Sequence, residues 1–333
     1  MEPKRYSRIY EHFPCKALIY NNIGFVYYNQ ADYAKAIEFY QKALIREKVV
    51  GIEDLGTAQT YNNIGLIYIF QGNNQKGLEY LQKSLQVRKK ILGDEHPDIA
   101  QTYNNIGLVF HDINYSKALK IYSKAIEIYK KTIGINHLNA MTTYYNIAEI
   151  YRNQGDYLKS LVIYKNCLLI HKTVLGIKHP KIAELYYGIG LVYDNQGKYL
   201  EALKMFQRSL RIFKETLGIN RVFAVYNKII SIYFKQNNLE GALDFLKKSL
   251  SIVEKELGIN NTNTATIYYD IAGIYYKQNN YKKALHYFWV SYNIFLHLND
   301  ENSKKAYNML EVIYKKSDSS ILLSEWLNEQ MQK

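Results

Sequence analysis

The sequence predicts an all-α protein of the α-solenoid class, built from seven helix-turn-helix units and a degenerate eighth. Three observations predict this fold. One short string recurs along the chain at a spacing near 42 residues. The apolar residues that follow each copy have helical spacing, and turn-forming residues separate the helices at fixed places. The 333 residues also exceed the size at which a single core stops growing, so a core that extends along one axis is expected.

The recurring string is Tyr20-Asn-Asn-Ile-Gly24, and identical copies end at Gly65 and Gly107. We call Gly24 and its equivalents the reference positions. In chain order these are Gly24, Gly65, Gly107, Ala148, Gly190, Ile230, Ala272 and Leu310. The first seven define complete units, and Leu310 marks a degenerate eighth.

Each unit is predicted to hold two helices, A and B, joined by a short turn. In the first unit Ile23 and Tyr27 are four residues apart in helix A, and Ile37, Tyr40 and Leu44 have the same periodicity in helix B. Gly and Asn, which accept the positive φ of a tight turn, lie between the two runs. The predicted turns include residues 29–32, 71–74, 153–156 and 195–198.

The units are joined by a second recurring string, Leu92-Gly-Asp-Glu-His-Pro97 and Leu175-Gly-Ile-Lys-His-Pro180. Its Gly is suited to end helix B in a left-handed cap, and its Pro is suited to the first turn of the next helix A. Pro14, Pro97 and Pro180 each precede a recurring Tyr by six residues. Helix A therefore begins near each of these prolines.

Small residues predict close packing of helix A on helix B. Besides the reference positions, small side chains recur at two phases of helix B, for example Ala36 and Ala43. Large residues lie between these phases: Tyr40, Leu81, Tyr122, Tyr164, Phe206, Leu246 and Phe288. Cys167 falls at one of the small phases and is predicted to be an inert core thiol.

The predicted organisation has three parts. Residues 1–13 are expected to resemble the end of a preceding helix B, with Glu11-His-Phe-Pro14 as the connector. Residues 14–302 hold the seven complete units. Residues 303–333 hold the degenerate eighth unit and an amphipathic capping helix that includes Leu322 and Trp326.

Composition and motifs predict a non-catalytic cytoplasmic protein. Two cysteines are too few for a disulfide framework or a cysteine metal site, and no apolar run approaches the ~18 residues of a membrane span. No apolar signal segment follows the N-terminus. Phosphate-loop, metalloprotease and nucleophile-elbow motifs are absent, and the histidines are scattered. We therefore expect no metal, no cofactor, no membrane association and no enzymatic activity.

A turn-linked helix pair with small and large residues at these phases resembles the tetratricopeptide repeat, whose usual unit has ~34 residues. The longer unit, the Asn-Asn pair in helix A and the Leu-Gly-x-x-His-Pro connector resemble the kinesin light chain type. The resemblance covers about residues 12 to 316. It implies a right-handed superhelix whose A helices line a concave groove, and a protein- or peptide-binding adaptor or scaffold. No heptad coiled coil precedes the repeats, so kinesin association is not implied.

The groove is predicted to be lined by helix A residues that face away from helix B. An Asn amide donates and accepts together, so it can pair with both polar groups of an extended peptide. In the resembled family Asn contacts bound peptide at the positions three and two before the reference position, which implies this role for Asn62, Asn63, Asn104 and Asn105. The candidate peptide-binding residues are Asn21, Asn22, Asn62, Asn63, Asn104, Asn105, Tyr145, Asn146, Arg152, Tyr187, Asn227 and Tyr269.

Several alternatives remain open at this point. The Asn side chains can form hydrogen bonds with the next repeat instead of with a peptide. At the position two before the reference residue, the sixth and seventh repeats have Lys228 and Asp270 in place of Asn. The chain can be a sensor or regulatory module of a larger signalling protein. Its net charge of +13 and 34 Tyr permit nucleic-acid binding, but a solvated Lys face and core Tyr explain both features more simply. The N-terminal repeat, which lacks a polar cap, can support self-association.

Overall fold

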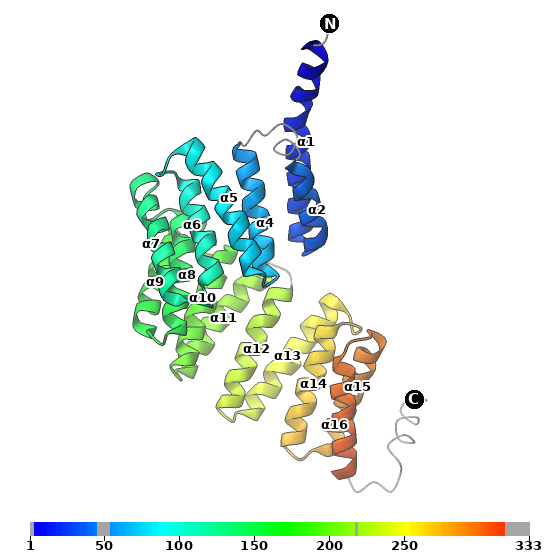
Figure 1. The fold of residues 1–333 in the computed structure, drawn as a ribbon. Coiled ribbons are helices and arrows are strands. Elements are labelled where there is room, and N and C mark those ends of the chain that lie inside the picture. The colour runs from blue at the N-terminus through cyan, green and yellow to red at the C-terminus, as the bar shows by residue number, and fades with distance from the viewer. Residues whose placement is uncertain (1–2, 45–53, 217–218, 317–333) are drawn as a thin grey trace. The chain divides into compact units, whose positions relative to one another are not determined.

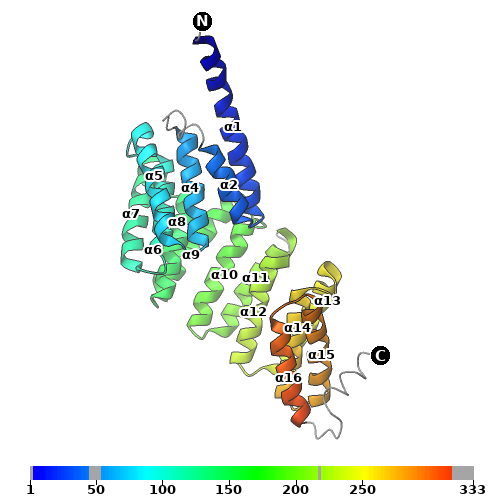
Figure 2. The same cartoon turned by 45° about the vertical axis from the view of Figure 1, so that its right-hand side comes forward.

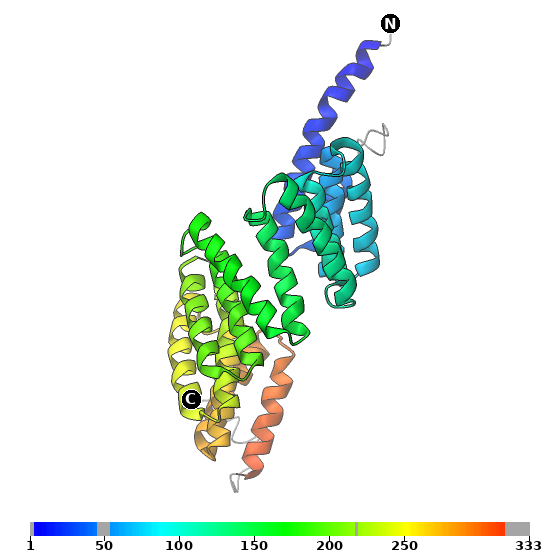
Figure 3. The same cartoon turned by 90° about the vertical axis from the view of Figure 1, so that its left-hand side faces the viewer.

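The computed structural model describes residues 3–44, 54–216 and 219–316, and within these ranges every regular element is a helix (Figure 1). The predicted all-α class is confirmed. The chain divides into two compact units, which we call unit 1 (residues 1–171) and unit 2 (residues 172–333). Each is built from successive antiparallel helix pairs (Figures 1 and 3).

The helices alternate between A and B types, as the period predicts. The A helices are α1 (Pro3–Asn29), α4 (Leu55–Phe70), α6 (Pro97–Phe110), α8 (Leu138–Asn153), α10 (Pro180–Asn195), α12 (Ile219–Lys235), α14 (Thr262–Lys277) and α16 (Asn302–Lys316). The B helices are α2 (Tyr33–Ala43), α5 (Asn74–Leu92), α7 (Tyr115–Thr132), α9 (Tyr157–Leu175), α11 (Tyr199–Thr216), α13 (Leu239–Leu257) and α15 (Tyr281–His297).

Local signals in the sequence set the ends of the helices. Gly93 ends α5 with a φ of 78°, a conformation that strongly favours glycine. Asp32 and Asn73 cap the starts of α2 and α5 by accepting from backbone amides three residues later. The connector histidine His96 has the same role, since its Nδ1 accepts from the Asp98 amide at 3.1 Å. The predicted turns and connectors are therefore confirmed in the repeats that contain these residues.

Each helix pair interlocks through a reference residue and the large side chain opposite it. A Cβ added to Gly107 would come within 2.3 Å of Tyr122, and one added to Gly190 within 2.7 Å of Phe206. All the predicted large residues are buried, and Tyr122 and Phe206 are fully so. The predicted packing rule is confirmed, because helix A approaches helix B more closely than a side chain at this position would permit.

Neighbouring pairs add contacts between successive repeats. In unit 1, Leu81 of α5 packs against Ile106 and Val109 of α6. In unit 2, α15 packs on both α14 and α16 (Figure 2), where Ile294 and Ala306 share one cluster. Each A helix after the first in its unit is thus covered by the preceding helix B.

The N-terminal part differs from the prediction. The helix predicted to end before a connector at residues 11–14 continues, and α1 runs without a break from Pro3 to Asn29. The other connectors have Gly four residues before Pro, whereas Tyr10 occupies that position here. This position therefore lacks the glycine cap that Gly93 supplies at the end of α5. At the other end, α16 begins at Asn302, close to the predicted boundary at 303, and the capping helix predicted around Leu322 lies outside the described residues.

Candidate binding site

The asparagines of unit 1 form hydrogen bonds from one A helix to the next. In each rung, the Asn three before a reference position accepts from the Asn two before the next reference position. Asn105 Nδ2 donates to Asn62 Oδ1 at 2.8 Å, and Asn104 Oδ1 accepts from Asn146 Nδ2 at 3.0 Å. We call this series, which begins with a longer 3.4 Å bond from Asn63 to Asn21, the amide ladder.

The amide ladder is largely buried. Asn62 exposes 2% of its surface, and Asn104 and Asn105 expose 7% each. Asn104 Nδ2 also donates to Asn105 Oδ1 at 3.3 Å, which joins two rungs. The bond across to the next repeat, left open by the sequence, is thus present, and it satisfies polar groups that would be costly to bury unpaired. Peptide contact by these amides stays a prediction.

The aromatic and charged candidates lie beside the ladder or beyond its end. Tyr145 packs edge-on against Tyr164 of its own repeat, with ring centroids 5.3 Å apart. Tyr269 packs edge-on against Phe288 of α15, and Tyr187 packs at a tilt against Phe206 of α11. All three rings are half-buried, as is Arg152, while Asn22 on α1 is exposed. Their role in binding also stays a prediction.

The amide ladder ends where the residue types change. Asn146 is the last donor of the ladder. The residue at the equivalent position in the next repeat is Gly188, which has no side-chain amide. In the sixth and seventh repeats the two ladder phases carry Asn227 and Asp270. These residues are separated along the chain like Asn62 and Asn105, but no side-chain hydrogen bond joins them within the described residues. We call this pair the open rung.

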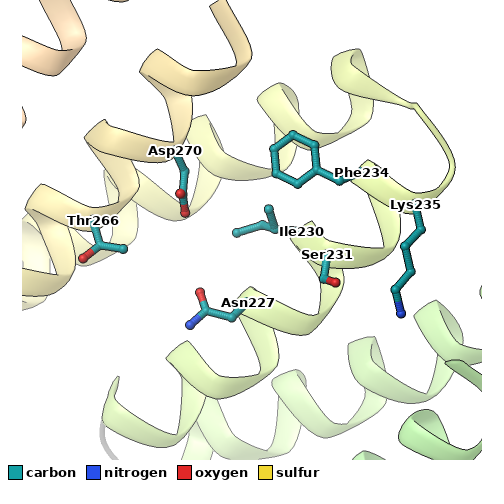
Figure 4. A pocket seen from close by; sticks show the side chains of 7 residues that line it. All are labelled: Asn227, Ile230, Ser231, Phe234, Lys235, Thr266 and Asp270. Atoms are coloured by element: carbon teal, nitrogen blue, oxygen red, sulfur yellow. The ribbon is translucent and has the colours of Figure 1, made fainter. Parts of the chain in front are cut away.

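The open rung lies in a pocket of about 650 Å³ between α12 and α14. Figure 4 shows Asn227 from α12 and Asp270 from α14 directed into the space between the two helices. Ile230 and Phe234 add apolar surface, and Ser231 and Thr266 add hydroxyl groups. A few polar groups around an apolar floor are typical of a ligand pocket.

The basic residues near the pocket already have partners. Lys235, which lines the pocket, donates to Asp194 on the neighbouring α10 at 2.6 Å. Lys277 lies over the Phe234 ring, with its Nζ 4.6 Å from the centroid. Asp270 itself forms no ion pair within the described part of the chain. Burial raises the pKa of its carboxyl from 3.8 to about 6.

The sequence identified one side of this pocket and missed the rest. Asn227 was a candidate residue, and Asp270 and the position of Phe234 follow from the repeat phases. Ile230, Ser231 and Thr266 were not candidates. The signal that leads to the pocket is the exchange of Asn for Asp at one ladder phase, because it replaces an amide that can donate by a carboxylate that can only accept.

A second unpartnered surface lies on α1. Ile19 and Val26 expose 54% and 53% of their surface, whereas the residues at the same two phases in the next six repeats expose 3% or less. The residues equivalent to Ile19 are Thr60, Thr102, Thr143, Leu185, Val225 and Ile267. Those equivalent to Val26 are Ile67, Val109, Ile150, Val192, Ile232 and Ile274. These phases are the repeat-stacking surface, and in the first repeat that surface is open.

Cys167 is buried, as predicted, and burial raises the pKa of its thiol to about 12. Among the described residues, no three His, Cys, Asp or Glu side chains come together as a metal-binding group. None of the helices in the described ranges is long and apolar enough to cross a lipid bilayer.

A model of the tetratricopeptide repeat family matches the chain at residues 15–76, 56–131, 139–215 and 221–296. A search of curated proteins finds no significant sequence match. Among solved structures, a candidate kinesin light chain with nearly identical repeats from Podospora anserina is 17% identical. It aligns over 62% of this chain and 99% of its own, with a TM-score of 0.51. The resemblance to the kinesin light chain type is therefore confirmed at the level of the fold.

Two other solved structures share this fold over more of the chain. One is a signal transduction ATPase with numerous domains and a tetratricopeptide repeat sensor, from Pyrococcus horikoshii. It is 17% identical over 93% of this chain and 46% of its own, with a TM-score of 0.63. The other is a Rap protein complexed with competence and sporulation factor, 16% identical over 95% of this chain and 99% of its own, with a TM-score of 0.53.

Proposed function

The chain belongs to the tetratricopeptide repeat family, and from that premise we propose that it is a non-catalytic adaptor that binds a segment of a partner protein. The proposed site is the pocket between α12 and α14. The open rung supports this choice, because Asn227 and Asp270 offer hydrogen-bonding groups that no described part of the chain uses.

An extended polypeptide suits this site better than a small rigid ligand. The pocket lies between two A helices, and its lining combines polar groups with the apolar side chains of Ile230 and Phe234. A peptide backbone can donate to the Asp270 carboxylate and the Asn227 carbonyl while its side chains cover the apolar floor. The solved Rap protein, which shares this fold, is complexed with competence and sporulation factor.

The test is binding of the purified chain to a random-peptide array at two salt concentrations. Three proteins are compared: the unmodified chain, a pocket-filling variant Ser231→Tyr, and a ladder variant Asn62→Ala/Asn104→Ala. Circular dichroism must show that both variants remain helical. We expect Ser231→Tyr to lose peptide binding and the ladder variant to keep it, because the ladder amides are already bonded to one another.

The other outcomes are equally informative. Loss of binding in the ladder variant alone would move the peptide site to the A helices of unit 1, where Asn62 and Asn104 were first predicted to contact peptide. Binding to none of the peptides would contradict the proposal. Affinity that falls steeply with salt, on a nucleic-acid probe rather than on peptides, would favour the nucleic-acid alternative.

We also propose that the open stacking surface on α1 binds the same surface of a second copy. Ile19 and Val26 occupy phases that are covered in the next six repeats, and Leu18 and Phe25 beside them are 62% and 53% exposed. Pairing of two such surfaces would bury apolar area that the first repeat alone leaves in water.

Sedimentation equilibrium tests this second proposal. The unmodified chain should dimerise at micromolar concentration, and Ile19→Glu/Val26→Glu should be monomeric. Leu158→Glu, which changes an exposed apolar residue on α9, serves as the control and should still dimerise. A monomer at 100 times that concentration, ~100 μM, would rule the dimer out.

A further inference from the structure

The chemistry of the open rung specifies what it can bind. In unit 1 the same two phases hold an amide donor and an amide acceptor, so the rung closes on itself. At the open rung the donor position is occupied by Asp270, whose carboxylate can only accept. Asp270 therefore cannot close the rung as the Asn105 amide does, and it forms no ion pair within the described residues.

The surrounding cations do not supply this partner. Lys235 is engaged by the buried carboxylate of Asp194, whose side chain is only 6% exposed. Moving Lys235 to Asp270 would leave the Asp194 carboxylate buried without its counter-ion, which is strongly unfavourable. Lys277 rests on the ring of Phe234. Burial raises the pKa of Asp270, so its ionised carboxylate would be stabilised by an incoming cation.

We propose that this pocket binds an arginine or lysine side chain of the partner polypeptide, with the cation bonded to the Asp270 carboxylate. The inference rests on the proposed peptide-binding function and adds the residue class that the site selects. The carbon stem of the bound side chain packs on Ile230 and Phe234, which line the same pocket.

Arginine fits better than lysine. Its planar guanidinium carries five N–H donors and can bond two acceptors at once, here the Asp270 carboxylate and the Asn227 side-chain carbonyl. Figure 4 shows these two groups on opposite sides of one space, with Ile230 between them. The aromatic ring of Phe234 lies in the same lining and adds a surface on which a guanidinium can stack.

The experiment uses the full chain and a positional-scanning array of octapeptides, followed by solution binding of the best peptide. Its basic residue is then replaced by citrulline, which keeps the shape of arginine and removes the charge. The protein variants are Asp270→Asn and Asp270→Lys. Asp244→Asn is the matched control, because Asp244 lies on α13, is 64% exposed and is paired with Lys248 outside the pocket.

We expect the unmodified chain and Asp244→Asn to select Arg, then Lys, at one peptide position. Citrulline in the peptide, or Asp270→Asn in the protein, should weaken binding by about 10-fold or more, the loss typical of breaking one desolvated charge pair. Asp270→Lys should change the preference at that position to Asp or Glu. Thermal melts must show that the Asp270 variants remain folded.

The alternative results separate this inference from the function on which it rests. Peptide binding without a basic preference, or a basic preference that survives in Asp270→Asn, would overturn the inference and leave the adaptor function standing. Loss of the preference in Asp244→Asn as well would show an effect of overall charge and would also overturn it. An unmodified chain that binds no peptide would contradict the adaptor function itself.

Discussion

Asn62 with Asn105 in unit 1, and Asn227 with Asp270 in unit 2, occupy the same two phases of successive A helices. The first pair is buried and closed by a 2.8 Å hydrogen bond, while the second lines a pocket of about 650 Å³ and is open. The helices around the two pairs are of the same kind. The two pairs differ in residue type at one phase, because the Asn105 amide donates to Asn62 whereas the Asp270 carboxylate can only accept.

This difference indicates that the same positions of helix A stabilise the fold in unit 1 and are available for binding in unit 2. The amide ladder uses the inward-facing polar groups of unit 1 to join its repeats, so those groups stabilise the fold. Unit 2 leaves the same phase available at Asp270, at a cost in stability, because its carboxylate is partly removed from water without a partner. Binding sites are often less stable than the scaffold around them for this reason.

The largest effect should come from breaking the ladder. Asn105→Ala leaves the carbonyl of Asn62 and an amide N–H of Asn104 without partners, and each buried unpaired group costs about 1–3 kcal/mol. We expect a loss of about 2–4 kcal/mol in the unfolding free energy, measured by urea denaturation. Asn22→Ala changes the same phase where it is exposed, and it should cost less than about 0.5 kcal/mol. Equal losses in both variants would show that the ladder bonds add nothing.

Removing the charge from the open rung should have the opposite sign. Asp270→Asn should stabilise the chain at pH 7, because the variant no longer has an ionised carboxylate in a poorly hydrated site. The pKa shift from 3.8 to about 6 sets an upper limit near 3 kcal/mol, and partial exposure reduces the expected gain to about 1–2 kcal/mol. Urea denaturation at pH 7 measures it, and a loss of stability would mean that Asp270 has a partner in the free protein.

Asp270 and His111 should have opposite effects on stability as the pH falls. Asp270 has a raised pKa in the folded state, so its contribution becomes more favourable as pH falls from about 6 toward 4. His111, buried beside Tyr122, has a pKa lowered by burial. The unfolded chain therefore binds that proton first, and stability is lost as pH falls below about 6.5.

Single variants isolate these two pH effects from the many surface carboxylates. Unfolding free energies from pH 4.5 to 8 are compared for the unmodified chain, Asp270→Asn and His111→Gln. The nearby groups are Lys235 and Tyr269 for Asp270, and Asp112 and Arg152 for His111. For each variant, the difference in unfolding free energy from the unmodified chain is plotted against pH. Slopes of the same sign for both variants would contradict the opposite pKa shifts of Asp270 and His111.

A further comparison concerns two helical glycines. Gly107→Ala places a Cβ 2.3 Å from the Tyr122 ring, which should cost about 1–3 kcal/mol and outweigh the gain of ~1 kcal/mol in helix propensity. Gly273→Ala has no atom within 4 Å of the new Cβ and should stabilise the chain by about 0.5–1 kcal/mol. Thermal melts of both variants test this, and a stabilising Gly107→Ala would show that Tyr122 can move aside.

The repeat period, read from the sequence alone, was sufficient for the helices and their pairing. Gly93 ends α5, Asn73 begins it, and Gly107 lies under Tyr122, each as its residue type and phase predicted. Such features depend on local backbone geometry and on side-chain size, which the chain carries at every position. At Pro14 the chain lacks the Gly that stands four residues before Pro97, so the glycine cap of that connector is missing there and α1 continues.

The sequence could not determine the hydrogen-bond partners of the polar side chains of helix A. An Asn amide has donors and an acceptor, so Asn62 is equally able to bond a peptide or the next repeat, and only the spacing of packed helices closes it onto Asn105. The same holds for Asp270. Its residue type was visible in the sequence, but its lack of a counter-ion depends on Asp194, distant in sequence, holding Lys235 in place. Periodicity fixes the helices, whereas hydrogen-bond partners and solvation are properties of the packed neighbours.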